Sequence, residues 1–389
     1  MANPLKQLAR YGQSVWYDNL NRELVDSGAL QRMVDKDNVT GGTSNPSIFE
    51  KAVGSGNAYD AQIHELAGQD KSLTEIYDAL TVKDIQLCCD IFRPVYDATK
   101  AGDGYSSLEV SPTIAYDTQL TTRDAKRLFA ALGRANAMIK IPGTPAGLPA
   151  IEECLTEGVN INITLLFGVD NYEQVAKAYI RALEKRQHAG RPIDRIASVA
   201  SFFVSRVDSM VDAQLEEKIK AAGSEAERET LRRLLGKAGV ANARIAYAKF
   251  KEIFSGDRWK ALEAAGARAQ RCLWASTSTK NPAYRDVIYV EELIGKQTIN
   301  TMPQSTLDAF RDHGEPRKSL EENVDEAFAH VRRLQDAGID FNGVTEELQT
   351  QGVKLFSDAF KKANDMVKGK RDKVLAEKQH GVGAAAVSD

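Results

Sequence analysis

Two short stretches, AMIKI (137–141) and NINITLL (160–166), decide the fold predicted for this chain of 389 residues. Each is an apolar run of the length of a buried strand. The second is followed by NYEQVAKAYIRALEKRQ (171–187), whose apolar residues recur at helical spacing. TTRDAKRLFAALGRA (121–135), before AMIKI, begins with Thr and an acidic residue, as helix starts often do. The region therefore predicts strands that alternate with amphipathic helices.

The same alternation continues on both sides of this region. The other strand candidates are SVWYD (14–18), NVTGGT (38–43), SSLEVS (106–111), IASVASF (196–202), RCLWAS (271–276) and TINTM (298–302). Eight strands separated by helices predict an α/β fold of the (β/α)₈ TIM-barrel class with extra helices. An open doubly wound sheet is the alternative, but no Gly-rich dinucleotide fingerprint follows the first strand.

The domain organisation follows from the lengths of the spacers. A barrel routinely uses about 250 or more residues as one unit, so we expect residues 1–365 to form a single barrel domain. Long spacers predict helical insertions near 46–105 and 207–270, and the second contains charged runs typical of solvated helices. Residues 366–389 are expected to hold the end of the last helix and a mobile tail.

Composition limits the classes of partner. The net charge of −3 and the pI of about 6.1 argue against nucleic acid or an anionic membrane as the main partner. No apolar stretch is long enough to span a bilayer, and the N-terminus lacks the apolar core of a secretory signal. The four cysteines show no metal-ligand spacing, and we expect buried, reduced thiols. A cytoplasmic enzyme is predicted; an oligomer is possible, and the sequence does not define its size.

Three strands carry polar residues on one face. Side chains of a strand alternate between its two faces. In SSLEVS, Ser107, Glu109 and Ser111 lie opposite Leu108 and Val110. In AMIKI, Met138 and Lys140 lie opposite Ile139 and Ile141, and in NINITLL, Asn160, Asn162 and Thr164 lie opposite Ile161, Ile163 and Leu165. We expect the apolar faces to meet the helices and the polar faces to point into the barrel, towards the C-terminal ends of the strands. Burial of such groups costs free energy unless they are paired. An active site explains the set better than a private polar network.

A lysine among these groups suggests imine chemistry. A confined lysine can lose its proton and attack a ketone, and the protonated imine then acts as an electron sink for carbon–carbon cleavage. Carboxylates such as Glu109 and Asp18 suit the proton transfers, and spacing alone permits either assignment. Asn and Ser groups would hold sugar hydroxyls. This route requires neither a metal nor another cofactor.

At this point the sequence resembles the transaldolases, specifically the longer bacterial type, over nearly the whole chain. The matching blocks are WYDNLNREL (16–24), GTSNPSIFEKA (42–52), SSLEVSP (106–112), MIKIPGT (138–144), INITLLF (161–167), SFFVSRVD (201–208) and GVKLFSDAF (352–360). Together these motifs are very specific. The resemblance implies transfer of a dihydroxyacetone unit from sedoheptulose 7-phosphate to glyceraldehyde 3-phosphate, which gives erythrose 4-phosphate and fructose 6-phosphate in the pentose phosphate pathway.

The resemblance also implies roles for individual residues. Lys140 would be the Schiff-base lysine, and Asp18 would be the acid/base for the carbon–carbon bond. Glu109 and Thr164 would activate water. The substrate would be bound through its hydroxyls by Asn45, Asn162 and Ser201, through its phosphate by Arg206, and along an apolar wall formed by Phe203. Three of these have simpler readings from the sequence alone. Asp18 can cap the following helix, Asn45 can form a plain turn before Pro46, and Arg206 can be a surface residue.

The chain departs from the family pattern after the seventh strand. Many transaldolases have a second phosphate-binding Arg there, whereas this chain reads WASTSTKNPAYRD (274–286). Lys280 occupies the expected neighbourhood, with Ser276 and Ser278 nearby, and Arg285 is a less suitable candidate. A lysine binds phosphate as a point charge and lacks the guanidinium fork.

Two rival functions remain open at this level. A fructose-6-phosphate aldolase-like lyase would use the same imine and release free dihydroxyacetone. A non-catalytic barrel could bind sugar phosphates as a regulator, although such a protein would be expected to lose the lysine or a carboxylate.

Overall fold

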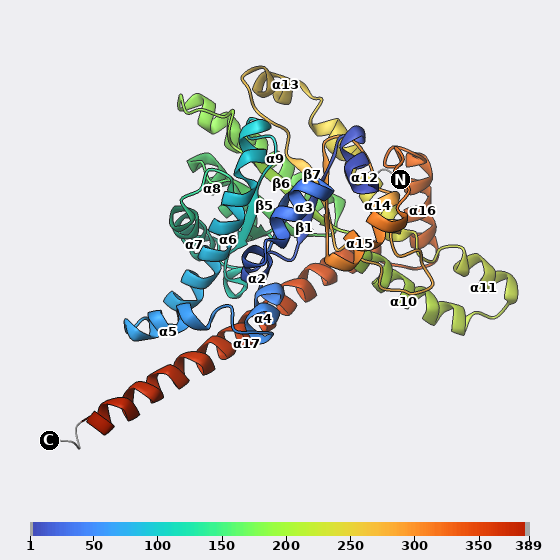
Figure 1. Ribbon diagram of the computed structural model, residues 1–389. Coiled ribbons are helices and arrows are strands. Elements are labelled where there is room, and N and C mark those ends of the chain that lie inside the picture. Colours follow the sequence, from blue (N-terminus) through green and yellow to red (C-terminus); the bar gives the residue numbers. More distant parts are fainter. Residues whose placement is uncertain (1–2, 386–389) are drawn as a thin grey trace.

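The computed structural model describes residues 3–385, and its eight parallel strands close into a barrel in the order β1 to β8 (Figure 1). The strands are β1 Gln13–Asp18, β2 Val39–Thr43, β3 Ser106–Glu109, β4 Ala137–Pro142, β5 Ile161–Leu166, β6 Ser198–Phe203, β7 Arg271–Ala275 and β8 Thr298–Met302. No predicted strand end is more than two residues from the observed end. The predicted (β/α)₈ barrel with extra helices is confirmed.

Helices surround the barrel and fill both long spacers. They are α1 Pro4–Leu8, α2 Arg22–Asp26, α3 Ala29–Asp37, α4 Pro46–Gly54, α5 Asp60–Gly68, α6 Leu73–Ala98, α7 Thr118–Leu132, α8 Gly147–Glu157, α9 Val169–His188, α10 Ser205–Ala221, α11 Glu225–Arg232, α12 Ala238–Ile253, α13 Asp257–Ala264, α14 Ile288–Glu291, α15 Gln304–His313, α16 Val324–Asp336 and α17 Phe341–Ala385, with short 3₁₀ turns at Ala9–Tyr11 and Pro112–Ile114. The spacer 46–105 thus holds α4 to α6, and most of 207–270 lies in α10 to α13.

Strand alternation sorts the core into two layers. Ile139, Ile141, Ile161 and Ile163 belong to the cluster packed against the surrounding helices. The inward-facing apolar residues form a second cluster, which includes Trp16, Met138, Val199, Leu273 and Ile299. Apolar side chains therefore fill much of the barrel interior, as in other barrels of this class.

The prediction for the two faces of β5 was wrong at two residues. Leu165 adopts a left-handed backbone conformation (φ 58°), and the pairing with β6 shifts register between Ile163 and Leu166. Leu165 consequently joins the inner cluster, while Leu166 packs in the outer one. Asn160 precedes the strand, and its Nδ2 donates to the carbonyl oxygens of Ala135 and Ala137, so it closes the N-terminal end of the barrel instead of facing the site.

The start of α7 also differs from the prediction at Thr121. The Oδ1 of Asp117 accepts a hydrogen bond from the backbone N–H of Leu120, so the helix begins three residues earlier, at Thr118. An Asp at this position satisfies an otherwise unpaired amide at the helix start.

The last helix, α17, crosses the barrel and continues alongside α4 and α5 (Figure 1). Gln349 anchors it, since its Nε2 donates to the carbonyl oxygens of Gly143 (3.2 Å) and Leu165 (3.0 Å). Gly352 permits a close approach, because a Cβ there would lie 2.8 Å from a methyl carbon of Leu165. The helix extends to Ala385, and the final part of the expected tail, 386–389, lies outside the described residues.

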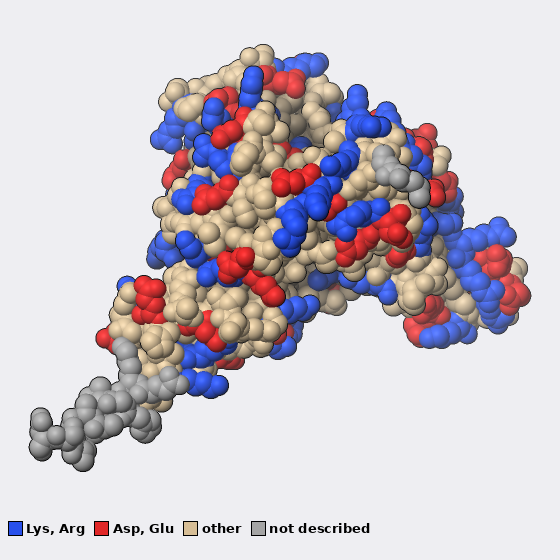
Figure 2. Space-filling view, in the orientation of Figure 1, with Lys and Arg blue, Asp and Glu red and all other residues tan. Residues whose placement is uncertain are grey.

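Charged side chains of both signs are intermixed over the face shown in Figure 2, including the projecting helix α11. Ion pairs such as Arg232–Glu225 and Arg228–Glu225 are largely solvent-exposed there, as predicted for the charged run in 207–270. Among residues 3–385, no helix combines the length and apolar character needed to cross a membrane.

Candidate active site

A cavity of about 570 Å³ opens at the C-terminal ends of the strands. Of the eleven site residues predicted from the sequence, nine line it: Asp18, Asn45, Lys140, Thr164, Ser201, Phe203, Arg206, Ser276 and Lys280. The other two, Glu109 and Asn162, contact lining residues directly, as described below. Barrel active sites occupy this end of the fold, so the cavity is the candidate site.

Lys140 and Glu109 form a buried pair at the base of this cavity. They are register partners on β4 and β3, and Lys140 Nζ lies 3.1 Å from Glu109 Oε2. Their side chains are only 5% and 3% exposed. Nζ also donates to the carbonyl oxygen of Ser44 at 3.1 Å. Burial raises the pKa of Glu109; the Lys140 charge opposes this increase and Asp18 adds to it.

Two functional groups beside Lys140 have unused hydrogen-bonding capacity. Neither carboxylate oxygen of Glu109 accepts a well-formed hydrogen bond within the described residues, and the hydroxyl of fully buried Thr164 also has no partner there. Buried polar atoms are nearly always paired in proteins, because an unpaired atom costs free energy. Their position beside a lysine suits them to interact with a reacting molecule.

Asn162 organises the interior directly beneath the cavity. It is the register neighbour of Lys140 on β5. Its Nδ2 donates to Ser107 Oγ (3.1 Å), and its Oδ1 accepts from Ser201 Oγ (2.7 Å). This chain of hydrogen bonds connects three strands and fixes the orientation of the Asn162 amide.

Asp18 is the second carboxylate of the site and ends β1. Its Oδ1 accepts a hydrogen bond from Thr43 Oγ1 at 2.6 Å, and Thr43 Oγ1 lies 3.2 Å from Thr301 Oγ1. The following helix is capped by Asn21, so the alternative role of Asp18 as a helix cap does not apply. Asp18 remains half-buried at the cavity wall, where a proton transfer is feasible.

Arg206 is one of the cations that line the cavity. It lies in the first turn of α10, and its Cζ is 5.8 Å from the ring centroid of Phe203. Burial lowers the pKa of Arg206, and the charge of Asp18 opposes that effect. A partly buried guanidinium without an ion-pair partner among the described residues is favourably placed for an anion such as phosphate.

The segment after β7 contributes Lys280 and two serines. Lys280 lines the cavity, and its Nζ donates to Ser278 Oγ at 2.6 Å. Ser276 adopts a left-handed conformation (φ 54°), and its Oγ lies 2.9 Å from Ser205 Oγ. Arg285 instead pairs with Glu291 at 2.7 Å outside the cavity. Lys280 is therefore the better placed of the two candidate phosphate ligands.

Asn45 combines a structural and a candidate binding role. Its Oδ1 accepts from the backbone N–H of Ile48 at 3.0 Å and caps α4, and its backbone is extended before Pro46. The alternative interpretation from the sequence, a purely structural role of Asn45 before Pro46, is thus partly right. The residue still lines the cavity, so its Nδ2 is the atom that could meet a substrate hydroxyl.

Lys51 on α4 and Phe356 on α17 are among the lining residues that sequence reasoning missed. The Phe356 ring centroid lies 5.8 Å from Lys140 Nζ and covers the lysine from above. Both residues lie within motifs matched by the family resemblance, but their helices were not assigned to the barrel mouth. The orientation of each helix about its own axis determines which of its side chains reach the site, and this orientation is seen only in the structure.

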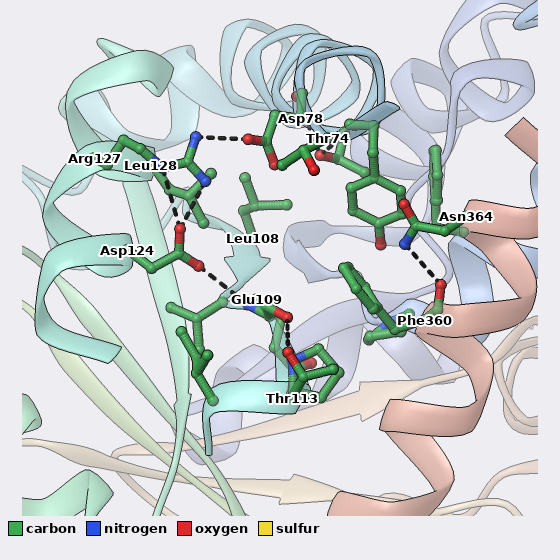
Figure 3. A pocket seen from close by; sticks show the side chains of 18 of the residues that line it. Thr74, Asp78, Leu108, Glu109, Thr113, Asp124, Arg127, Leu128, Phe360 and Asn364 are labelled. Carbon is green, nitrogen blue, oxygen red and sulfur yellow. Dashed lines mark hydrogen bonds and ion pairs between the residues drawn. The ribbon is translucent and has the colours of Figure 1, made fainter. Parts of the chain in front are cut away.

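A second cavity of about 430 Å³ lies on the other side of β3 (Figure 3). Its charges are largely neutralised internally, since Arg127 contacts Asp78 and Asp124, each at 2.6 Å. Glu109 lies on its wall, but Lys140 does not. The cavity around Lys140 is therefore the better candidate for an anionic substrate.

The fold and the site together define a class: a (β/α)₈-barrel enzyme with a buried lysine beside a carboxylate, under a cavity rich in cations. The model of the family described as transaldolase/fructose-6-phosphate aldolase matches residues 15–367. The chain belongs to this family.

Named relatives match over nearly their full length. A transaldolase of Trichodesmium erythraeum is 49% identical, over 92% of this chain and 95% of the relative. "Transaldolase 2" of Nostoc sp. is 46% identical, over 95% and 97%. A transaldolase of Thermobifida fusca is 45% identical, over 94% and 98%. The resemblance to bacterial transaldolases seen in the motifs is confirmed.

Proposed function

We propose that this enzyme is a transaldolase that transfers a dihydroxyacetone unit from sedoheptulose 7-phosphate to glyceraldehyde 3-phosphate through a Schiff base on Lys140. The products are erythrose 4-phosphate and fructose 6-phosphate. The observation that carries the proposal is the buried Lys140–Glu109 pair, 3.1 Å apart, beneath a cavity lined by cations. Membership of the family supports the same reaction.

Imine formation is assigned to Lys140, Glu109 and Thr164. The ammonium group first gives a proton to Glu109, whose raised pKa makes it a better proton acceptor. The neutral amine attacks the C2 carbonyl carbon and forms a carbinolamine. Glu109 then returns a proton to the departing hydroxyl, and Thr164 holds the resulting water, so that a protonated imine remains.

Cleavage of the carbon–carbon bond is assigned to Asp18. This carboxylate takes the proton of the C4 hydroxyl, the C3–C4 electron pair moves into the imine, and erythrose 4-phosphate leaves. The enamine on Lys140 attacks the aldehyde carbon of glyceraldehyde 3-phosphate, and Asp18 returns the proton to the new hydroxyl. Hydrolysis through Glu109 and Thr164 releases fructose 6-phosphate.

Binding is assigned to the remaining lining residues. Asn45, Asn162 and Ser201 hold substrate hydroxyls, and Phe203 forms an apolar wall. Arg206 binds the phosphate with its planar fork, and Lys280 adds a point charge, with Ser276 nearby. These contacts orient the ketone carbon towards Lys140, which lowers the entropic cost of the attack.

The substrates and the four buried, free cysteines fit a cytoplasmic location, where thiols stay reduced. We propose sugar phosphates as the partners of this site, without nucleic acid or membrane.

Borohydride trapping with fructose 6-phosphate tests the mechanism, read by intact mass and peptide mapping. We expect one reduced dihydroxyacetone adduct, on Lys140, and none on a folded Lys140→Ala variant. If folded, active wild-type enzyme forms no adduct, the Schiff-base mechanism is wrong.

The family description also includes fructose-6-phosphate aldolase, so the product must be identified. We expect fructose 6-phosphate to yield glyceraldehyde 3-phosphate at a useful rate only when an acceptor aldehyde such as erythrose 4-phosphate is present. Rapid release of free dihydroxyacetone without an acceptor would instead identify a lyase.

A further inference from the structure

Helix α4 presents one continuous face to the candidate site. Ser47, Ile48 and Lys51 line the cavity, and their spacing of one and four residues places them on one side of the helix. The opposite side, with Pro46 and Phe49, faces the second cavity. Side chains on a helix tilt towards its N-terminus, so Lys51 is directed back towards the barrel mouth.

The cavity has an excess of positive charge. Lys51, Arg206 and Lys280 line it in addition to Lys140, whereas Asp18 is the only acidic residue among the described lining residues. Within residues 3–385, none of the first three has a carboxylate within ion-pair distance; Lys280 contacts only the Ser278 hydroxyl. Several exposed helical lysines, such as Lys177, Lys220 and Lys368, have such a partner one turn away.

The three cations also affect one another. Burial is the main cause that lowers the pKa of Lys280, and the charges of Arg206 and Lys51 lower it further, while Asp18 opposes them. Mutual repulsion of this kind is relieved when a multiply charged anion binds between the cations.

We propose that Lys51 is a specificity-determining residue that binds the phosphate of the sugar substrate together with Arg206 and Lys280. The inference rests on the proposed function, because it assigns a third cation to the phosphate end of the same substrate. Many transaldolases bind the phosphate with two arginines, whereas this site has only the guanidinium of Arg206. We infer that two lysine charges, Lys280 after β7 and Lys51 on α4, replace the second arginine. Lys51 acts on binding and does not touch the reacting carbon atoms.

The test compares wild type with Lys51→Gln and Lys51→Arg in the borohydride assay, using fructose 6-phosphate and unphosphorylated fructose. The readout is the sugar concentration that gives half of the maximal Lys140 adduct. For fructose 6-phosphate we expect Lys51→Gln to raise this concentration about tenfold, the scale of one lost contact between charged groups. Lys51→Arg should restore it to within about threefold, and fructose should show no difference between the variants.

Lys362→Gln is the matched control, because Lys362 is an exposed helix residue outside the cavity and its loss changes the net charge equally. It should leave the half-saturating concentration of fructose 6-phosphate unchanged. Inorganic phosphate should compete with fructose 6-phosphate about tenfold less well in Lys51→Gln than in wild type.

Two results would overturn the inference: equal half-saturation in wild type and Lys51→Gln, or an equal rise with fructose and fructose 6-phosphate. In both cases wild type still forms the adduct, so the proposed transaldolase reaction stands. Failure of the proposed function has a different signature, since wild type itself then forms no adduct.

Discussion

Two buried carboxylates at opposite ends of the barrel differ in how their oxygens are used. Asp103, at the N-terminal end, accepts hydrogen bonds from Trp16 Nε1 (2.8 Å), Thr40 Oγ1 (2.9 Å), Ser14 Oγ and the Gly104 amide, and Arg271 lies 3.4 Å away. Glu109, at the other end, has one cation at 3.1 Å and no well-formed hydrogen bond in the described part of the chain.

The difference shows how one fold separates stability from chemistry. A carboxylate with saturated hydrogen bonds holds strands together and has no lone pair left for a reactant. A carboxylate with few partners destabilises the fold but can exchange a proton with an adjacent group. Both carboxylates are buried, and the one with unused hydrogen-bonding capacity is the one that lies beside Lys140.

The strongest test of this comparison neutralises each of the two carboxylates, Glu109 and Asp103, in a separate variant. We expect Glu109→Gln to lower kcat roughly 10²–10⁴-fold, the usual contribution of a positioned acid/base, while the protein stays folded. Asp103→Asn should cost about 2–4 kcal/mol of unfolding free energy, because it replaces an acceptor used by several donors, with kcat nearly unchanged. Steady-state kinetics and urea unfolding measure both.

A comparable loss of kcat in the two variants would break the comparison. So would a loss of stability in Glu109→Gln as large as that in Asp103→Asn.

A smaller effect is expected in the pH dependence of the unfolding free energy, and its direction follows from the pKa of Glu109. The folded pKa of Glu109 is raised above its ordinary value of 4.5 because burial disfavours the carboxylate. The folded state therefore binds the proton more tightly than the unfolded state does, so stability falls as pH rises from about 4.5 through the raised pKa. We expect wild type to lose stability relative to Glu109→Gln across that window and the difference to be constant above it.

Urea unfolding of both proteins at a series of pH values measures the difference. A difference that stays flat, or that favours wild type as pH rises, would contradict the assigned burial effect.

Two threonines give the smallest effects, with opposite signs. Thr164→Val removes a buried hydroxyl without a partner, so unfolding free energy should stay equal or rise by about 1 kcal/mol, while kcat falls. Thr40→Val removes a donor to Asp103 and should lower unfolding free energy by about 1–2 kcal/mol without affecting kcat. Equal stability changes in the two variants would show that the two ends do not differ in this way.

The sequence predicted the barrel well because strand period and short length are local signals. The same period placed Lys140, Glu109 and Asn162 in one interior, and parallel strands bring their ends together. Asp117 was missed as the N-cap of α7 because Thr121 offers the same capping chemistry four residues later.

The remaining errors have a common physical cause. Alternation fails at Leu165, where a left-handed residue turns the chain, and nothing in the apolar run INITLLF signals that turn. Lys51 and Phe356 were missed because helices project side chains all round, and packing against neighbours sets their rotation. Neither a strand pattern nor a single motif specifies such features, because they depend on packing between distant parts of the chain.

The position of α17 in the chain affects the order in which the protein is built on the ribosome. All eight strands, and every charged group assigned to the reaction, precede Phe341, so a growing chain can close its barrel before α17 has been translated. Until Gln349 docks and Phe356 covers Lys140, the nascent barrel presents its amine to the surrounding solvent. The cover over Lys140 is then the last part of the site to form, after the barrel that supports it.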